Sequence, residues 1–162
     1  MKTDRALVAA GCFWGVQFYF DQVPGVMQTT VGYTGGRLKN PTYDDVCTGQ
    51  TGYAESVLIE FDPKKISYQM VLKHFFRLHD PTQLNRQGPD VGTQYRSAIF
   101  YSNQEQRAVA IKLRNDTQIK LDAPVVTDIE PAGAFYPAEP YHQKFAERTG
   151  IGMCHIPYKS LR

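Results

Sequence analysis

The order of strand-like and helix-like segments constrains the fold of this chain more than its composition does. Apolar segments typical of buried strands lie at 5–10, 26–33, 54–61, 97–101 and 125–130, and helical patterns lie at 12–21, 67–79, 103–120 and 141–149. A short helical piece before residue 47, a long loop at 80–94 and an irregular tail at 151–162 complete the pattern. Because strands and helices do not alternate strictly, we expect an α+β sandwich rather than a doubly wound fold.

Length and charge narrow the class of protein further. With 162 residues and neither a linker nor a repeat, we expect one domain over 1–162, with 149–162 as a flexible tail. A formal net charge of +2 does not support nucleic acid or an anionic membrane as a partner. No apolar run reaches the roughly 18 residues of a membrane span. The apolar residues 6–10 before Cys12 are also too few for a lipoprotein signal, so we expect a cytoplasmic protein.

The cysteines carry the most reactive chemistry in the chain, and there are three of them: Cys12, Cys47 and Cys154. Their odd number and the lack of CxxC-type spacing do not suit a disulfide framework or a zinc site. In a reducing compartment each is either a small buried apolar residue or a reactive thiol. The histidines do not cluster with the cysteines at metal-ligand spacing, so no metal is expected. We place each of them at the surface or beside the site: His74, His79, His142 and His155.

Cys12 lies where the first predicted strand meets the first predicted helix, between Gly11 and Gly15. The unpaired N–H groups and the positive dipole of a first helical turn favour a thiolate over a thiol. Gly11 would allow a tight turn that leaves the sulfur open to a ligand. These features fit a reactive thiol and a buried cysteine at a strand end equally well.

Short sequence blocks spread over nearly the whole chain are more specific. They are GCFWG (11–15), GYTGG (32–36), NPTY (40–43), VCTG (46–49), TGYAE (51–55), GTQYRS (92–97) and YHQ (141–143). In content and order they resemble the methionine sulfoxide reductase A (MsrA) family, whose nucleophile lies in the first block. The resemblance implies an oxidoreductase that reduces methionine-S-sulfoxide, protein-bound and free, to methionine. The expected fold is a two-layer α/β sandwich with a mixed sheet, a ferredoxin-like core and an irregular C-terminal tail.

Reducing a sulfoxide requires a thiolate that attacks sulfur and an acid that protonates the oxygen. The resemblance makes Cys12 the nucleophile, which is left as a sulfenic acid. Counting by twos places Glu55 at the end of the apolar face of 55–61, where desolvation would raise its pKa and keep it protonated. Glu55 is therefore the expected acid, with a solvated glutamate at a strand start as the alternative. Tyr43 and Tyr95 match tyrosines implied to hydrogen-bond the sulfoxide oxygen.

The resemblance also implies a substrate pocket. Phe13 and Trp14 match residues that receive the methyl group on sulfur, and Asp90 matches an acidic residue that helps to hold the substrate. Core packing of the two rings and an Asp90 that caps a loop turn are the structural alternatives. Cys47 matches a family position that looks structural, and the neighbouring Val46 indicates burial.

The tail carries the third thiol, Cys154, shortly after Gly150 and Gly152. This flexibility would let Cys154 reach the Cys12 sulfenic acid and condense with it to a disulfide. The family's C-terminal Gly-Tyr-Cys segment is similar, with Met153 here in place of tyrosine. The implied cycle needs no bound cofactor, because thioredoxin acts as the external reductant of the Cys12–Cys154 disulfide.

The expected partners are thioredoxin and oxidised proteins or peptides that contain methionine sulfoxide, and we expect a monomer. A thiol peroxidase also passes through a cysteine sulfenic acid and is the alternative enzyme. Comparing peroxide with methionine sulfoxide as the oxidant would separate the two. The non-enzymatic alternative is a metal-binding module, which lacks paired ligand spacing; its ligands would be Cys47, Cys154, His142 and His155.

Overall fold

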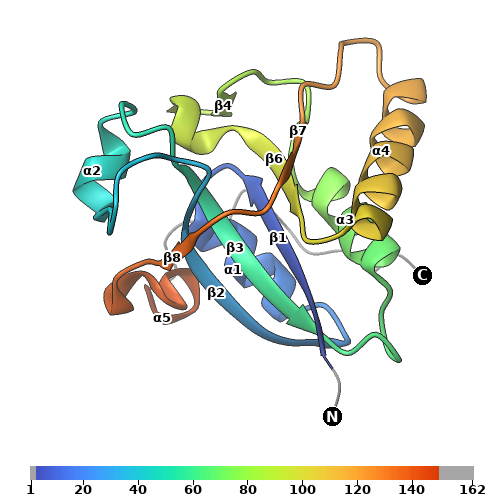
Figure 1. Cartoon of the computed structure of the whole chain (residues 1–162), viewed down its shortest axis with the longest axis horizontal. Helices are drawn as coiled ribbons and strands as arrows, with labels where there is room; N and C mark the ends of the chain where they lie inside the picture. Colours follow the sequence, from blue (N-terminus) through green and yellow to red (C-terminus); the bar gives the residue numbers. More distant parts are fainter. Residues whose placement is uncertain (1–2, 150–162) are drawn as a thin grey trace.

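The computed structural model describes residues 3–149, so Cys154 and the tail beyond residue 149 lie outside the described part. The strands are β1 (Asp4–Ala10), β2 (Val26–Thr34), β3 (Ala54–Phe61), β4 (Arg86–Gln87), β5 (Asp90–Val91), β6 (Ser97–Tyr101), β7 (Asp128–Pro131) and β8 (Phe135–Pro137). The α-helices are α1 (Phe13–Asp21), α2 (Tyr43–Cys47), α3 (Tyr68–Leu78), α4 (Gln104–Ile119) and α5 (Phe145–Thr149). Two 3-10 turns are η1 (Thr93–Tyr95) and η2 (Pro140–His142). Figure 1 shows their arrangement.

A six-stranded sheet in the order β7-β6-β1-β3-β2-β8 organises the fold, and β4 pairs with β5 in a separate hairpin. Neighbouring strands of the large sheet are antiparallel except β6 and β7, which are parallel. Helix α1 joins β1 to β2, and α3 lies between β3 and β6 along the chain. The predicted α+β class with a mixed sheet is confirmed, whereas the ferredoxin-like description of its core stays a prediction.

The sheet is strongly curled, because a short segment joins its two edge strands. Only residues 132–134 connect β7 at one edge to β8 at the other. The chain from Pro131 to Phe135 reaches at most roughly 14 Å, whereas a flat sheet would separate its edges by about 24 Å. The segment crosses the sheet in Figure 1, and Phe135 packs on a cluster that includes Ala9, Ala54 and Ala98. These small side chains let the concave face close.

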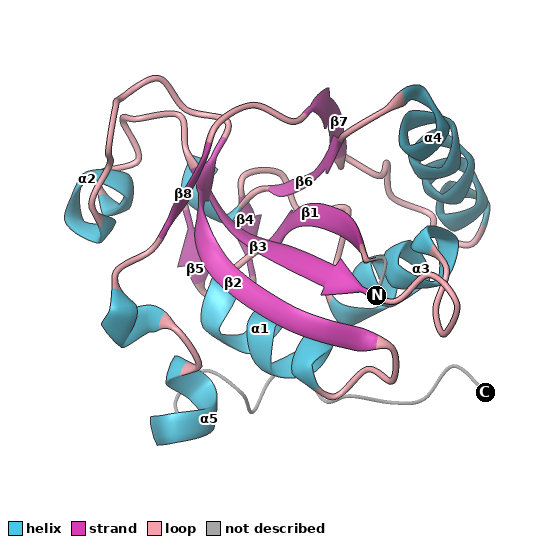
Figure 2. Cartoon of the chain, turned by 60° about the horizontal axis from the view of Figure 1, so that its bottom comes forward, coloured by secondary structure: helices cyan, strands magenta, loops and turns pink. Residues whose placement is uncertain are grey.

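The other face of the sheet carries the larger core, under α1 and α3 (Figure 2). Period-two alternation sends successive residues of a strand to opposite faces. Along β1, Ala6 and Val8 therefore join the aromatic core, while Leu7 joins the concave cluster. In the same way β3 directs Val57 and Ile59 toward the helices. Among the described residues, no helix is long and apolar enough to cross a membrane.

The local signals for helix starts are confirmed. The Ser67 side chain accepts a hydrogen bond from Met70 N (3.1 Å), and Asn103 Oδ1 accepts one from Gln106 N (2.8 Å). Both residues have extended backbone geometry, as helix caps require. The predicted strands at 54–61 and 97–101 have the observed bounds. The predicted loop at 80–94 contains the β4–β5 hairpin and the start of η1 in addition to irregular chain.

The predicted helix at 141–149 is confirmed only for Phe145–Thr149 and is wrong before it, because the chain breaks between η2 and α5. Lys144 takes a φ of 57°, in the left-handed region that interrupts a right-handed helix. The Gln143 side chain instead bonds to an inner strand: Oε1 accepts from Val31 N and Nε2 donates to Val31 O, each at 3.0 Å. Lys144 Nζ donates to Asp21 Oδ2 at 2.7 Å. Tertiary hydrogen bonds therefore outweigh the helical sequence pattern here.

Candidate active site

Three predicted site residues lie at one end of the sheet because the strands that carry them pair antiparallel. Cys12 lies two residues after Ala10, the last residue of β1, and Ala10 pairs with Ser97, the first residue of β6. Tyr95 lies two residues before Ser97. Val8 pairs with Val57, which brings the start of β3, where Glu55 lies, to the same end. Pairing register thus brings together residues that are more than 80 positions apart in the chain.

Cys12 caps α1 and is a partly exposed free thiol. The backbone N–H groups of Trp14 and Gly15, in the first turn of the helix, lower the pKa of this thiol. Burial raises the pKa more strongly, to about 12, and the neighbouring Glu55 charge acts in the same direction. The expectation of a stabilised thiolate is therefore wrong for the free protein, in which Cys12 holds its proton. The cause is that desolvation exceeds the effect of two backbone donors.

The turn before Cys12 requires glycine. Gly11 has a φ of 97°, a conformation that side-chain-bearing residues rarely adopt. A Cβ atom at this position would lie 2.8 Å from Gln87 Cβ. The close approach places the loop that carries Asp90 directly against the nucleophile.

Glu55 is a buried acid beside Cys12, with only 1% of its surface exposed. Its Oε1 accepts a hydrogen bond from Phe13 N at 3.2 Å, while Oε2 is buried and has no partner within residues 3–149. Burial raises the pKa of Glu55 to about 8, more than the Phe13 hydrogen bond lowers it. The carboxyl is thus protonated at neutral pH. Because Oε1 accepts from the backbone, Oε2 is the oxygen placed to carry the proton.

Tyr43 and Tyr95 flank the same carboxyl from two other elements. Tyr43 begins α2, and Tyr95 ends η1. Burial, followed by the charge of Glu55, raises the pKa of both phenols above the ordinary value. Both hydroxyls therefore remain neutral hydrogen-bond donors at physiological pH, in electrostatic contact with Glu55.

The two aromatic residues after Cys12 lie in different surroundings. Phe13 is 1% exposed and packs against Tyr33 and His142, with ring centroids 5.8 and 5.4 Å away. Trp14 is partly exposed and stacks on Phe145 at 4.1 Å. Phe13 is thus a core residue, and Trp14 is the ring accessible to a ligand.

Asp90 shares a cavity of about 170 Å³ with the nucleophile. The cavity is lined by Ala10, Cys12, Leu78, Gln87, Gly88, Pro89 and Asp90, and its walls include neither Phe13 nor Trp14. The Asp90 charge raises the pKa of both Cys12 and Glu55. Asp90 therefore lies close to the same reacting groups, in a cavity that the two aromatic residues do not line.

Two residues that support the site were not assigned from the sequence. Glu139 accepts hydrogen bonds from Tyr33 Oη (2.9 Å) and from Tyr43 N (3.0 Å), which fixes the start of α2. His142 Nδ1 accepts a hydrogen bond from Trp14 Nε1 at 2.9 Å. The YHQ block marks the region of His142, but its spacing from Trp14, 128 positions away, gives no sign of contact.

Cys47 and His74 differ from the predictions. Cys47 is exposed rather than buried, because it ends α2 and only Val46 turns inward; its sulfur hydrogen-bonds the Tyr43 hydroxyl. His74 is buried rather than at the surface, 4% exposed, whereas His142 is 1% exposed and lies beside the site, one of its two expected places. Within residues 3–149, no three acidic, histidine or cysteine side chains are grouped to hold a metal ion.

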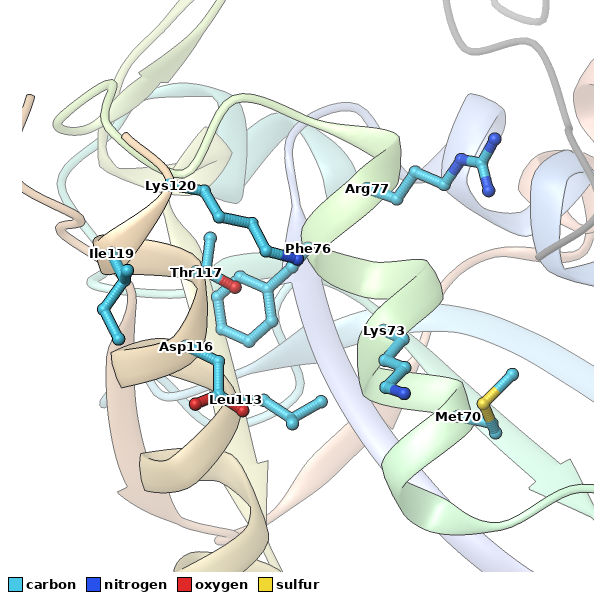
Figure 3. A pocket seen from close by; sticks show the side chains of 9 residues that line it. All are labelled: Met70, Lys73, Phe76, Arg77, Leu113, Asp116, Thr117, Ile119 and Lys120. Atoms are coloured by element: carbon cyan, nitrogen blue, oxygen red, sulfur yellow. The ribbon is translucent and has the colours of Figure 1, made fainter. Parts of the chain in front are cut away.

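A second hollow, of about 780 Å³, lies between α3 and α4 (Figure 3). Its walls are formed by Met70, Lys73, Phe76, Arg77, Leu113, Asp116, Thr117, Ile119 and Lys120. The acidic group among them, Asp116, pairs with Lys112 at 3.0 Å. The hollow shares no residue with the Cys12 site, and its walls hold no nucleophilic thiol.

Comparison with known proteins identifies the chemistry that these groups serve. The family model for peptide methionine sulfoxide reductase matches residues 4–162. The chain belongs to this family. A relative from Acidobacterium capsulatum, peptide methionine sulfoxide reductase MsrA, is 52% identical over 154 residues, which cover 94% of this chain and 99% of the relative. The predicted family and activity class are thereby confirmed: the protein is an oxidoreductase that reduces methionine sulfoxide.

Solved structures agree with this membership. Mxr1 from Saccharomyces cerevisiae in its reduced form has a TM-score of 0.92 and 32% identity, covering 98% of this reductase and 93% of Mxr1. Mxr1 in complex with Trx2 is also similar, with a TM-score of 0.64 and 25% identity over 90% of this chain and 86% of that one.

Proposed function

We propose that this reductase converts methionine-S-sulfoxide, in proteins and as the free amino acid, to methionine with Cys12 as the nucleophile. The observation that carries the proposal is the buried Glu55 carboxyl beside Cys12. Its Oε1 is held by Phe13 N, and its pKa of about 8 keeps the acid protonated at neutral pH. A protonated carboxyl next to a thiol supplies both groups that sulfoxide reduction needs.

The first step balances without an external oxidant. Glu55 gives its proton to the sulfoxide oxygen, the Cys12 sulfur bonds to the substrate sulfur, and the Cys12 proton passes to the Glu55 carboxylate. The thiol proton becomes acidic as the Cys12 sulfur bonds to the substrate sulfur, and the Glu55 carboxylate, whose own pKa is raised by burial, accepts it. The adduct then collapses: the oxygen leaves with its proton on Cys12 as a sulfenic acid, and the thioether of methionine is released.

The remaining side chains orient the substrate. The neutral Tyr43 and Tyr95 hydroxyls donate to the oxygen, whose basicity increases as the S–O bond breaks. Trp14, backed by the buried Phe13, receives the methyl group, and Asp90 holds the substrate from the cavity beside Cys12. An apolar wall on one side and oxygen donors on the other select one sulfoxide epimer, which the family resemblance assigns as S.

The second step regenerates the enzyme. The Cys154 thiol attacks the Cys12 sulfenic acid, water leaves, and a Cys12–Cys154 disulfide forms. Thioredoxin reduces this disulfide by exchange, a proposal supported by the similarity to the Mxr1 complex with Trx2. No resident cofactor takes part. Because the cycle depends on reduced thiols, we place the enzyme in the cytoplasm and expect a monomer that meets oxidised proteins and thioredoxin in turn.

A thioredoxin-coupled assay of NADPH consumption on the separated sulfoxide epimers tests the proposed function. We expect turnover with the S epimer, none with the R epimer and none with hydrogen peroxide. Turnover with peroxide but not with either sulfoxide would assign a thiol peroxidase instead.

Replacing Trp14 with alanine should raise KM for the sulfoxide roughly tenfold, the equivalent of about 1.4 kcal/mol of lost contact with the methyl group. Steady-state kinetics on the S epimer measures this. Phe18→Ala is the matched control, because Phe18 is a partly buried aromatic residue of the same helix outside the site. Equal KM values for the wild type and the Trp14 variant would reject the proposal that Trp14 receives the methyl group.

Replacing Cys154 with serine should leave the first reduction intact but stop turnover with thioredoxin. One equivalent of methionine per enzyme would form, because the sulfenic acid then has no thiol to condense with. Rapid-quench measurement of methionine and mass analysis of the protein follow both steps. The Cys47→Ser variant is the control and should turn over normally, with a Cys12–Cys154 disulfide after sulfoxide treatment. If Cys154 of the wild type stays a free thiol after this treatment, its role as the resolving cysteine is rejected.

A further inference from the structure

His142 is a buried histidine that contacts both proposed halves of the substrate site. It is 1% exposed and lies in η2, far from Cys12 in the sequence. Its ring centroid lies 4.3 Å from that of Tyr43, the proposed oxygen donor. The ring also lies 5.7 Å from Trp14, the proposed wall for the methyl group. The aromatic contacts therefore join the polar and apolar sides of the site through one side chain.

One hydrogen bond defines the protonation state of this ring. The indole Nε1–H of Trp14 can only donate, so His142 Nδ1 must be an acceptor without a proton. The neutral ring then carries its proton on Nε2. That nitrogen is buried and makes no hydrogen bond with the described residues, so the bond from Trp14 is the hydrogen bond that holds the ring among them. Burial also lowers the pKa of His142, in agreement with a neutral ring.

The backbone beside His142 is held firmly. Gln143 bonds to both backbone groups of Val31, and Lys144 N donates to Gln17 Oε1 at 2.7 Å. His142 N itself donates to Glu139 O at 2.9 Å. Because Gln17 belongs to α1 and Val31 to β2, the segment of the histidine is anchored to the helix that carries Trp14 and to the strand that follows it. A fixed ring can set the position of the indole, rather than simply follow it.

We propose that His142 is a positioning residue for substrate binding, which fixes the Trp14 indole through Nδ1 and supports the Tyr43 ring by contact. The proposal rests on the proposed function, in which Trp14 receives the methyl group of the sulfoxide. His142 does not touch the reacting atoms, so its effect is on substrate affinity more than on the chemical step.

Two matched substitutions separate the hydrogen bond from the packing. His142→Phe keeps an aromatic ring against Tyr43 but removes the acceptor, which leaves the indole N–H of Trp14 without this partner. His142→Asn loses most of the ring but can present Oδ1 near the place of Nδ1. Trp14 is the only tryptophan of the chain, so its fluorescence reports on this contact without interference.

In His142→Phe we expect KM for methionine-S-sulfoxide to rise about fivefold, with the single-turnover rate at saturation changed less than twofold. Quenching of Trp14 fluorescence by acrylamide should increase. His142→Asn should restore both values most of the way to wild type. In a Trp14→Phe background, which has no indole N–H, His142→Phe should add no further increase in KM.

The outcomes distinguish a failure of the His142 proposal from a failure of the proposed function. If Trp14→Ala leaves KM unchanged, the role of Trp14 in binding the methyl group is rejected. If Trp14→Ala raises KM while His142→Phe changes neither KM nor quenching, His142 does not position the indole. Equal defects in the Phe and Asn variants would overturn the role of the hydrogen bond, and an additive effect in the Trp14→Phe background would do the same.

Discussion

The Cys12→Ser variant is expected to reduce no methionine sulfoxide, in a single turnover as well as in the coupled assay. A serine hydroxyl is a far weaker nucleophile and cannot carry the transferred oxygen as a sulfenic acid, so the loss should reach several orders of magnitude. Release of methionine from the S epimer, measured by chromatography, tests this. The substitution removes no hydrophobic contact of note, because Cys12 is a partly exposed helix cap.

The matched control is Cys47→Ser. Cys47 is a free thiol close to the same site, since its sulfur hydrogen-bonds Tyr43, yet it lies on the exposed end of α2. We expect the Cys47 variant to retain activity within about twofold, because serine can also interact with the phenol. Retained sulfoxide reduction in Cys12→Ser, together with its loss in Cys47→Ser, would reassign the nucleophile.

Replacing Glu55 with glutamine should lower the single-turnover rate roughly 10²- to 10³-fold, the range for loss of a general acid. Glutamine keeps the size of the side chain and can still accept from Phe13 N through its amide oxygen, so the fold should be preserved. Glu60→Gln is the control, because Glu60 lies on the same strand and its carboxylate faces Arg5 at 3.8 Å. Full single-turnover activity in Glu55→Gln would exclude Glu55 as the acid.

The pH dependence of the wild type follows from the same group. The raised pKa of Glu55, about 8, means that the acid is protonated below that value and ionised above it. The proposed step needs both the Glu55 and the Cys12 protons, and Cys12 keeps its own up to about pH 12. The single-turnover rate should therefore be level below pH 8 and fall about tenfold per unit above it. Glu55→Gln should lack this decline.

The sequence predicted the strand and helix order well where local signals agree with tertiary packing. Caps at Ser67 and Asn103 are local features, and alternation along the strand places Glu55 on the same face as the buried Val57 and Ile59. The burial of Glu55 follows from that alternation. The strand β8 was missed because its three residues pair only through the curl of the sheet, which no local pattern records.

The errors in the site have one physical origin, which is burial that depends on the assembled fold. Helix position suggested a stabilised thiolate at Cys12, but desolvation raises its pKa instead. The apolar neighbour Val46 suggested that Cys47 is buried. In α2 only Val46 faces inward, and Cys47, the next residue along the helix, is exposed. His142 contacts Trp14 across 128 positions, and the left-handed turn at Lys144 nearby interrupts a helical sequence pattern.

The central claim is that oxygen passes from the substrate to the sulfur of Cys12. The most direct measurement uses the Cys154→Ser variant, treated with one equivalent of methionine-S-sulfoxide in the presence of dimedone, a reagent that traps sulfenic acids. Peptide mapping by mass spectrometry then locates the label. We expect one dimedone adduct, on the peptide that contains Cys12, in step with the methionine released. A label on Cys47, or methionine formed without any adduct on Cys12, would contradict the claim.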